Sequence, residues 1–380
     1  MLMNPVQSVD QGRRRLLQTS GAFALAGLPA WGAAAPAAPA AAPAAPAAPL
    51  ARLVLAGPPA IVSAPLIHMA ETQALAGVAE RVEFTPWRDP DQLRVMALGR
   101  KADVLAMPSN VAANLYNRGA GVTLLSISTW GALWIVTRDG ARRTLADFRG
   151  EEIAVPFRGD MPDLMLQLLT ARQGLDVRRD FRVRYVPTPM EAMQLLITRR
   201  VRHALLSEPA VSLALRKTQS FPLGLVAPAL HRGADLQQEW GRVFQRAPRI
   251  PQAGIAAVGA LRGQGAALAA VDAAYARSVA WCRAHPQECG RMVAARIDLL
   301  TPDAVADALA TSQLDAVPAQ RARAEVDFFF QQLLARDPAL LGGRLPDSGF
   351  FHSPAQPHAS NAAPASSHCG LSSGRSCHTT

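Results

Sequence analysis

Residues 89–98 read Asp89-Pro-Asp-Gln-Leu-Arg-Val-Met-Ala-Leu98, and a short apolar segment, Ala102-Asp-Val-Leu-Ala-Met-Pro-Ser109, follows them. The same order recurs later in the chain, where Thr188-Pro-Met-Glu-Ala-Met-Gln-Leu-Leu-Ile197 precedes His203-Ala-Leu-Leu-Ser-Glu-Pro209. Each copy predicts a capped helix with proline in its first turn, then a basic turn, then a short strand that ends at a proline. The repeat indicates two similar lobes, each with a strand–helix–strand core.

Outward from these copies, apolar strands alternate with helices along most of the chain. The spacing predicts strands at 53–56, 82–85, 102–107, 122–127, 132–137, 152–155, 181–186, 203–206 and 254–258, and helices at 63–80, 89–99, 109–118, 160–174, 188–199, 267–284 and 319–334. Crossovers of this length predict an α/β fold in which each lobe holds a mostly parallel sheet flanked by helices.

The restart of the pattern divides the chain into lobes. Residues 51–140 together with 252–350 are expected to form the first lobe, and residues 141–251 the second. The chain then crosses twice, near 137–142 and near 249–253, so a hinge of two segments is expected.

The N-terminus resembles a twin-arginine export signal. Arg13, Arg14 and Arg15 precede Leu16 and Leu17, and a mildly apolar run and small residues follow. A charged segment, a short apolar segment and a small-residue exit are typical of an export peptide. Residues 1–35 are therefore expected to direct the protein to a bacterial periplasm, although a basic N-terminal helix on a cytosolic protein is the alternative. Residues 36–50 are an Ala/Pro-rich linker.

Later segments carry no uninterrupted apolar run long enough to cross a bilayer, and the first cysteine is Cys282. We therefore expect a soluble protein without a lipid anchor. Cys282 and Cys289 flank Pro286 and either pair or remain two separate thiols, since sequence does not fix their geometry. Residues 351–380 are expected to be a disordered tail. Its histidines and cysteines form a conceivable metal site, and incidental ligands or a disulfide are the alternative.

Charge and motifs exclude several functions. The formal net charge is +10, but the arginines are dispersed and no zinc finger, RNP motif or basic–aromatic alternation is present, so no nucleic-acid partner is expected. The chain has no nucleophile elbow, Walker loop, paired zinc-ligand histidines or dinucleotide fingerprint. We expect a monomeric protein that is not an enzyme and uses no cofactor or metal.

The candidate site lies where predicted strands end and helices begin, because ligands of parallel α/β sheets bind there. The candidates on the two lobes are Pro59, Ser63, Trp87, Ser109, Asn110, Arg158, Asp160 and Glu208. The guanidinium group of Arg158 either forms a bidentate hydrogen bond with an anion or is solvated at the surface. The Glu208 carboxylate either accepts a hydrogen bond from a ligand or pairs with an arginine. Ser109 and Asn110 also suit simple helix capping. Trp87 stacks on a planar ligand or packs in the core. His68 and His203 are interpreted as packed, structural histidines.

Three stretches resemble a known family. They are Lys101-Ala-Asp-Val-Leu-Ala-Met-Pro-Ser-Asn-Val-Ala-Ala-Asn-Leu-Tyr-Asn-Arg-Gly119, Leu145-Ala-Asp-Phe-Arg-Gly-Glu-Glu-Ile-Ala-Val-Pro156 and Ala204-Leu-Leu-Ser-Glu-Pro209. Together they resemble periplasmic solute-binding proteins of the nitrate/sulfonate/taurine ABC-transporter group, which includes binders of thiamine-pyrimidine precursors. The chain departs from that group at His203, where an acid is usual, and near Arg200, where glycine is usual.

The resemblance implies the type II two-lobed binding-protein fold, closing on a small polar or anionic organic solute. It also implies partners: a membrane permease that receives the solute, and the twin-arginine translocase during export. Two other readings stay open. The same fold hosts exported transferases and pyrimidine-related enzymes, and the His/Cys tail suits a periplasmic metal-handling protein.

Overall fold

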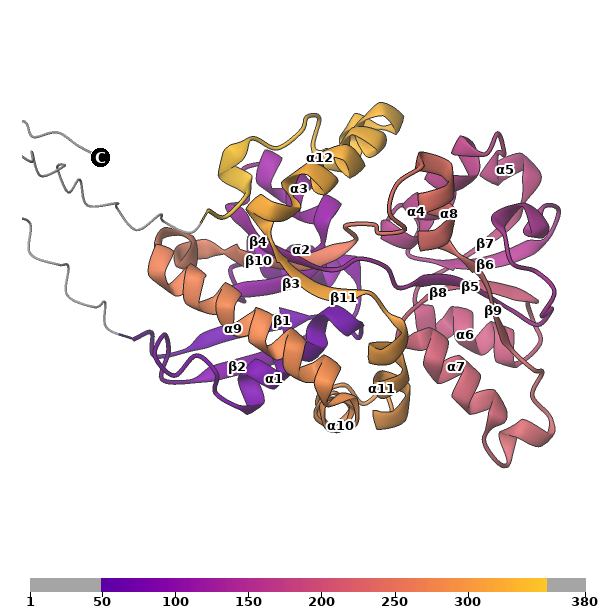
Figure 1. The fold of residues 1–380 in the computed structure, drawn as a ribbon, viewed down its shortest axis with the longest axis horizontal. Helices are drawn as coiled ribbons and strands as arrows, with labels where there is room; N and C mark the ends of the chain where they lie inside the picture. The colour runs from indigo at the N-terminus through magenta and orange to yellow at the C-terminus, as the bar shows by residue number, and fades with distance from the viewer. Residues whose placement is uncertain (1–48, 354–380) are drawn as a thin grey trace, which may run out of the picture. The chain divides into compact units, whose positions relative to one another are not determined.

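The computed structural model describes residues 49–353, in which two β-sheets are each covered by helices on both faces (Figure 1). The expected export signal, most of the Ala/Pro linker and the tail from residue 354 lie outside the described residues. No helix within 49–353 is long and apolar enough to span a membrane.

The first lobe holds a six-stranded sheet in the order β11-β4-β10-β3-β1-β2. Its strands are β1 (Leu53–Gly57), β2 (Val82–Pro86), β3 (Val104–Pro108), β4 (Val122–Thr129), β10 (Ala253–Val258) and β11 (Leu314–Pro318). β1 is parallel to β2 and β3, whereas β10 runs antiparallel to both β3 and β4. β1 to β4 therefore run in one direction, and β10 and β11 return against them.

The second lobe repeats this arrangement in a five-stranded sheet, β7-β6-β8-β5-β9. Its strands are β5 (Leu133–Thr137), β6 (Glu152–Pro156), β7 (Arg182–Val186), β8 (His203–Ser207) and β9 (His231–Asp235). β6 is parallel to β7 and β8, and β5 runs against β8 as β10 runs against β3. The mostly parallel sheets and the repeated unit agree with the sequence prediction.

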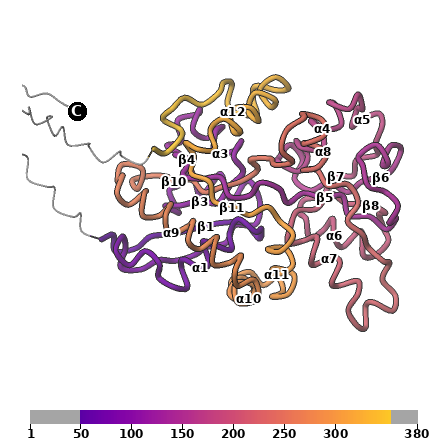
Figure 2. The backbone as a smooth tube through the Cα atoms, in the orientation of Figure 1, coloured from indigo at the N-terminus to yellow at the C-terminus, as the bar shows by residue number. Residues whose placement is uncertain are grey.

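The chain passes between the two sheets twice, and the backbone can be followed through both passages in Figure 2. The first passage lies between β4 and β5, earlier than the expected 137–142, because β5 pairs with β8 and β9. The expected placement of 132–137 in the first lobe was therefore wrong. The second passage, between residues 244 and 253, includes the expected 249–253.

Helices fill both faces of each sheet, and their apolar sides form two continuous cores. The α-helices are α1 (Ala64–Glu71), α2 (Pro90–Leu98), α3 (Ser109–Asn117), α4 (Met161–Arg172), α5 (Val177–Asp180), α6 (Pro189–Ile197), α7 (Ala210–Gln219), α8 (Leu236–Phe244), α9 (Gly265–Ala284), α10 (Pro286–Arg296), α11 (Pro302–Thr311) and α12 (Ala319–Arg336). Short 3-10 turns lie at Ile61–Ser63, Leu145–Phe148, Leu223–Leu225, Gly259–Gly263, Pro338–Leu341 and Ser348–Phe350.

Three segment boundaries in the structure differ from those predicted from the sequence. The helix expected at 63–80 ends at Glu71, because Gln73 takes a positive φ of 49° and its amide bonds to Ala70 and Val82 instead. Leu50, placed in the linker, bonds to the backbone beside Ala79. Phe351, placed in the tail, is buried, and the next residue donates its N–H to Leu124.

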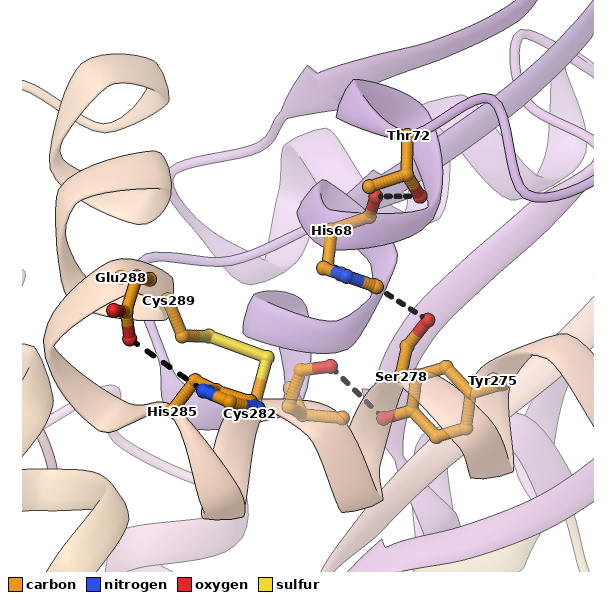
Figure 3. Close-up of a disulfide and its surroundings, with 9 residues drawn as sticks. His68, Thr72, Tyr275, Ser278, Cys282, His285, Glu288 and Cys289 are labelled. Atoms are coloured by element: carbon orange, nitrogen blue, oxygen red, sulfur yellow. Dashed lines mark hydrogen bonds and ion pairs between the residues drawn. A yellow bond between two sulfur atoms is a disulfide. The ribbon is translucent and has the colours of Figure 1, made fainter.

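Cys282 and Cys289 form a disulfide between the end of α9 and the second turn of α10 (Figure 3). Pro286 starts α10 and breaks the helix between them, as the sequence predicted. Beside the disulfide, His68 of α1 stacks on Trp281 with ring centroids 4.2 Å apart, and its Nδ1 lies 2.9 Å from Ser278 Oγ. The disulfide thus lies at the junction of α1, α9 and α10.

Replacing both cysteines with alanine is expected to lower the free energy of unfolding by about 2 kcal/mol, since the disulfide closes a short loop and limits the unfolded chain. Urea titration followed by circular dichroism measures this loss. The oxidised and reduced wild-type proteins should differ by a similar amount. An unchanged urea midpoint in the double variant would contradict the prediction.

His203 of β8 is fully buried, with its Nδ1 2.8 Å from Thr137 Oγ1. Burial lowers the pKa of His203 to about 4, despite the Glu151 carboxylate 3.6 Å from Nε2. An unfolded histidine has a pKa near 6.5, so the unfolded chain alone takes up this proton as the pH falls from 6.5 towards 4. Stability is therefore expected to fall with pH across that window, by up to roughly 3 kcal/mol from this group.

A pH series of urea unfolding tests this dependence. His203→Gln should flatten the stability curve between pH 6.5 and 4, whereas His231→Gln, at an exposed position, should leave its slope unchanged. Equal slopes in the wild type and in His203→Gln would show that another group dominates.

Candidate ligand-binding site

The strand ends of the two lobes meet at one cavity of about 120 Å³. The first lobe contributes the turns after β1, β2 and β3 and the start of β10, and the second lobe contributes the turns after β6 and β8. A larger groove of about 890 Å³ lies elsewhere, lined by the second lobe and by Arg336. Of these two, the smaller cavity joins the strand ends of both sheets, which makes it the stronger candidate site.

Four of the eight expected site residues line this cavity: Pro59, Trp87, Asp160 and Glu208. Trp87 is nearly buried, and its indole Nε1 donates to the carbonyl oxygen of Ala106 at 3.2 Å. Its polar atom is thus used within the protein, which leaves only an apolar ring edge for a ligand.

Asp160 joins the two lobes across one side of the cavity. It is the N-cap residue of α4, yet its carboxylate makes no capping bond and instead accepts from Arg94 of α2 at 3.1 Å. Burial raises the pKa of Asp160, and the charge of Arg94 opposes that rise. The pair is a contact that forms only when the lobes stand this close.

Glu208 is fully buried at the end of β8, and its oxygens are occupied by protein donors. Oε1 accepts from Arg232 at 2.7 Å and from Thr311 of α11 at 3.3 Å, and Oε2 accepts from the Ser212 backbone N–H at 3.0 Å. Of the two readings that the sequence left open, the structure places Glu208 in an ion pair with an arginine.

The other four expected residues lie outside the cavity lining. Ser63 and Ser109 are buried, and their hydroxyls donate at 2.6 Å to the carbonyl oxygens of Pro58 and Pro251. Asn110 lines a separate pocket beside Arg94. Arg158 lies over the ring of Tyr185, 5.0 Å from its centroid, in the larger groove of the second lobe. Strand-end position alone did not show which way these side chains turn.

Sequence reasoning missed four polar residues of the cavity, Arg88, Thr129, Ser207 and Gln252. Thr129 ends β4, and Gln252 precedes β10 and donates its backbone N–H to the Thr129 carbonyl at 3.0 Å. Their positions at strand ends were a usable signal. Among residues 49–353, no group of three histidine, cysteine or acidic side chains is placed to hold a metal ion.

Neither a protein-family model nor a curated protein matches the sequence. Solved structures do match the fold. An ABC transporter structure from Parabacteroides distasonis is 21% identical, with a TM-score of 0.62, and the match covers 79% of this chain and 98% of that one.

Two further matches are named for their ligands. The periplasmic aliphatic sulphonate binding protein of Escherichia coli is 15% identical, with a TM-score of 0.57 and coverage of 78% and 92%. The periplasmic nitrate-binding protein of Synechocystis PCC 6803 is 13% identical, with a TM-score of 0.57 and coverage of 76% and 82%. The resemblance noted in the sequence is thus matched in the fold. Residues 49–353 have the two-lobed fold of the periplasmic binding proteins of ABC transporters, as seen in the sulphonate- and nitrate-binding structures.

Proposed function

We propose that this protein is the solute-binding component of an ABC importer, which captures a small organic solute between its lobes and delivers it to a membrane permease. The observation that carries the proposal is the cavity itself, built from strand ends of both lobes. Two chain passages join those lobes, and such an arrangement permits them to close around a ligand.

The Arg94–Asp160 pair supports this role, because it spans the two lobes beside the cavity. A ligand that fills the cavity favours the closed arrangement by the difference between its affinities for the closed and open states. The permease then has a closed form to recognise.

A binding role without catalysis also fits the lining. Among the described residues, no histidine lines the cavity, and its two carboxylates are each paired with an arginine. The enzyme alternative requires a general base that is free to reach a substrate.

The test begins with native mass spectrometry of protein purified from periplasm, to detect a retained small molecule. Ala60→Trp places a large ring in the cavity wall and should abolish retention and the uptake of that molecule by cells. Ala276→Trp, the same change on the exposed face of α9, is the matched control. Normal retention and uptake in Ala60→Trp would overturn the proposal.

Export by the twin-arginine route is a further part of the proposal, and it rests on Arg13, Arg14 and Arg15. The exported protein is then a periplasmic monomer. Changing all three arginines to lysine should leave the precursor in the cytoplasm, which cell fractionation measures. Undiminished accumulation in the periplasm would point to the general secretory route instead.

A further inference from the structure

The turns around the cavity carry prolines where an anion-binding site would have N–H groups. Pro58 and Pro59 follow β1, Pro90 begins α2, Pro162 lies in the first turn of α4, and Pro189 begins α6. Helix starts bind oxyanions through free backbone N–H groups, and proline has none. The remaining wall is mainly aliphatic and aromatic, with Ile61, Met107, Val111, Phe157 and Met161 among its residues.

The charges of the lining also disfavour an anion. Asp160 and Glu208 are both part of the wall, and the arginines that neutralise them, Arg94 and Arg232, lie outside it. Arg88 is the one cation among the lining residues, and its side chain is exposed, where water screens its charge. A bound anion would therefore find no unpaired, buried cation among the described lining residues.

Two residues of the lining, Thr129 and Gln252, each have a buried side-chain atom with no partner within the described protein. The atoms are Thr129 Oγ1 and Gln252 Oε1, on residues that are 3% and 7% exposed. Leaving such atoms unpaired costs about 1–3 kcal/mol each, so a ligand that supplies their hydrogen bonds gains affinity. A hydroxyl donates or accepts, and the side-chain amide of glutamine offers both functions.

The size of the cavity limits the ligand. An engineered apolar cavity of about 150 Å³ binds benzene, and the volume here is about 120 Å³. The cavity volume is therefore close to that of a single ring, which sets the approximate size of the ligand.

We propose that the ligand is an uncharged single-ring compound that bears a carboxamide or similar donor–acceptor group, rather than an oxyanion. The inference rests on the proposed solute-binding function and specifies its ligand class. The ring packs against the proline and aliphatic wall, and the polar group bonds to Thr129 and Gln252. Of the polar or anionic solutes that the resemblance implies, this proposal selects the polar, uncharged class.

The test compares benzamide with benzoate, two probes that share a ring and differ in charge, by isothermal calorimetry on the full mature protein. Benzamide should bind at least tenfold more tightly. Thr129→Val and Gln252→Met should each weaken benzamide binding about 5- to 10-fold, the effect of one lost hydrogen bond. Arg277→Gln, at an exposed position on α9 outside the cavity lining, is the control and should leave benzamide affinity unchanged.

Tighter binding of benzoate that is lost in Arg88→Gln would overturn the inference. So would benzamide binding that is unaffected by both Thr129→Val and Gln252→Met. Binding of nitrate or taurine that Ala60→Trp abolishes, with no benzamide binding, would overturn the ligand class but retain the solute-binding function. The solute-binding function itself is tested separately, by the retention and uptake experiment with Ala60→Trp. Thermal melts of every variant confirm that each is folded before its affinity is compared.

Discussion

Replacing Gly254 with alanine is expected to lower the free energy of unfolding by more than about 3 kcal/mol. Gly254 lies in β10, between β3 and β4 in the first sheet. A Cβ atom there would stand 1.9 Å from the carbonyl oxygen of Ser126 and 2.9 Å from the Cα of Ile127. Both contacts are to backbone within a paired strand, so the clash is relieved only by disrupting the sheet.

Urea unfolding of the purified variant measures this effect, and poor recovery of folded protein is the extreme result. The matched control is Gly77→Ala, because Gly77 is exposed and a Cβ atom there meets nothing within 4 Å. A Gly254→Ala variant as stable as Gly77→Ala would show that β10 is not packed against β4 as described.

Arg232→Met is expected to cost about 3 kcal/mol of stability, at the low end of the range for breaking a buried pair, because Arg232 is itself partly exposed. The change leaves the Glu208 carboxylate buried without its arginine. Glu208→Gln in the same chain removes that charge, so the double variant should recover most of the loss.

The control for this cycle is Arg249→Met, which breaks an exposed pair with Asp315. Exposed pairs contribute about 0–1 kcal/mol, so this variant should remain close to the wild type. Urea titration measures the free energy of unfolding of Arg232→Met, of its double variant with Glu208→Gln, and of Arg249→Met. If Arg232→Met proves as mild as Arg249→Met, the stability of the folded protein does not depend on the pairing of Glu208 with Arg232.

This pair also changes how Glu208 is understood. One reading that the sequence left open is that Glu208 accepts a hydrogen bond from a ligand, in which case Glu208→Ala would weaken binding by about 1–3 kcal/mol. Because donors of the protein occupy both carboxylate oxygens, the first effect now expected is on stability. A change in affinity would follow only from a disturbed cavity wall.

Local signals predicted seven of the twelve α-helices in the described residues and the central strands of both lobes, whereas α5, α7, α8, α10 and α11 were not among the expected helices. Asp89 caps α2 by accepting from the backbone of Asp91 and Gln92, and Thr188 caps α6 through the N–H of Glu191. These contacts join residues two or three positions apart, so the sequence nearby is sufficient to specify them. Apolar runs such as β6 and β8 were found for the same reason.

Edge elements were harder to find. β9 reads His-Arg-Gly-Ala-Asp and β11 contains Asp315, so neither shows the apolar alternation of a typical strand. They are strands because β5 and β4 offer them unpaired backbone groups. β5 belongs to the second sheet because it pairs with β8 and β9, and the order of segments along the chain does not reveal this pairing.

The sequence by itself determined the two-lobed α/β fold, the strand-end turns that line the cavity and the break between Cys282 and Cys289, because each depends on neighbouring residues. Only the tertiary structure decided which side chains reach the cavity. Ser109 bonds to Pro251, 142 positions away, and Asp160 turns to Arg94 on the other lobe. A polar side chain takes the nearest partner that removes the cost of burial, and that partner is known only when distant segments have packed.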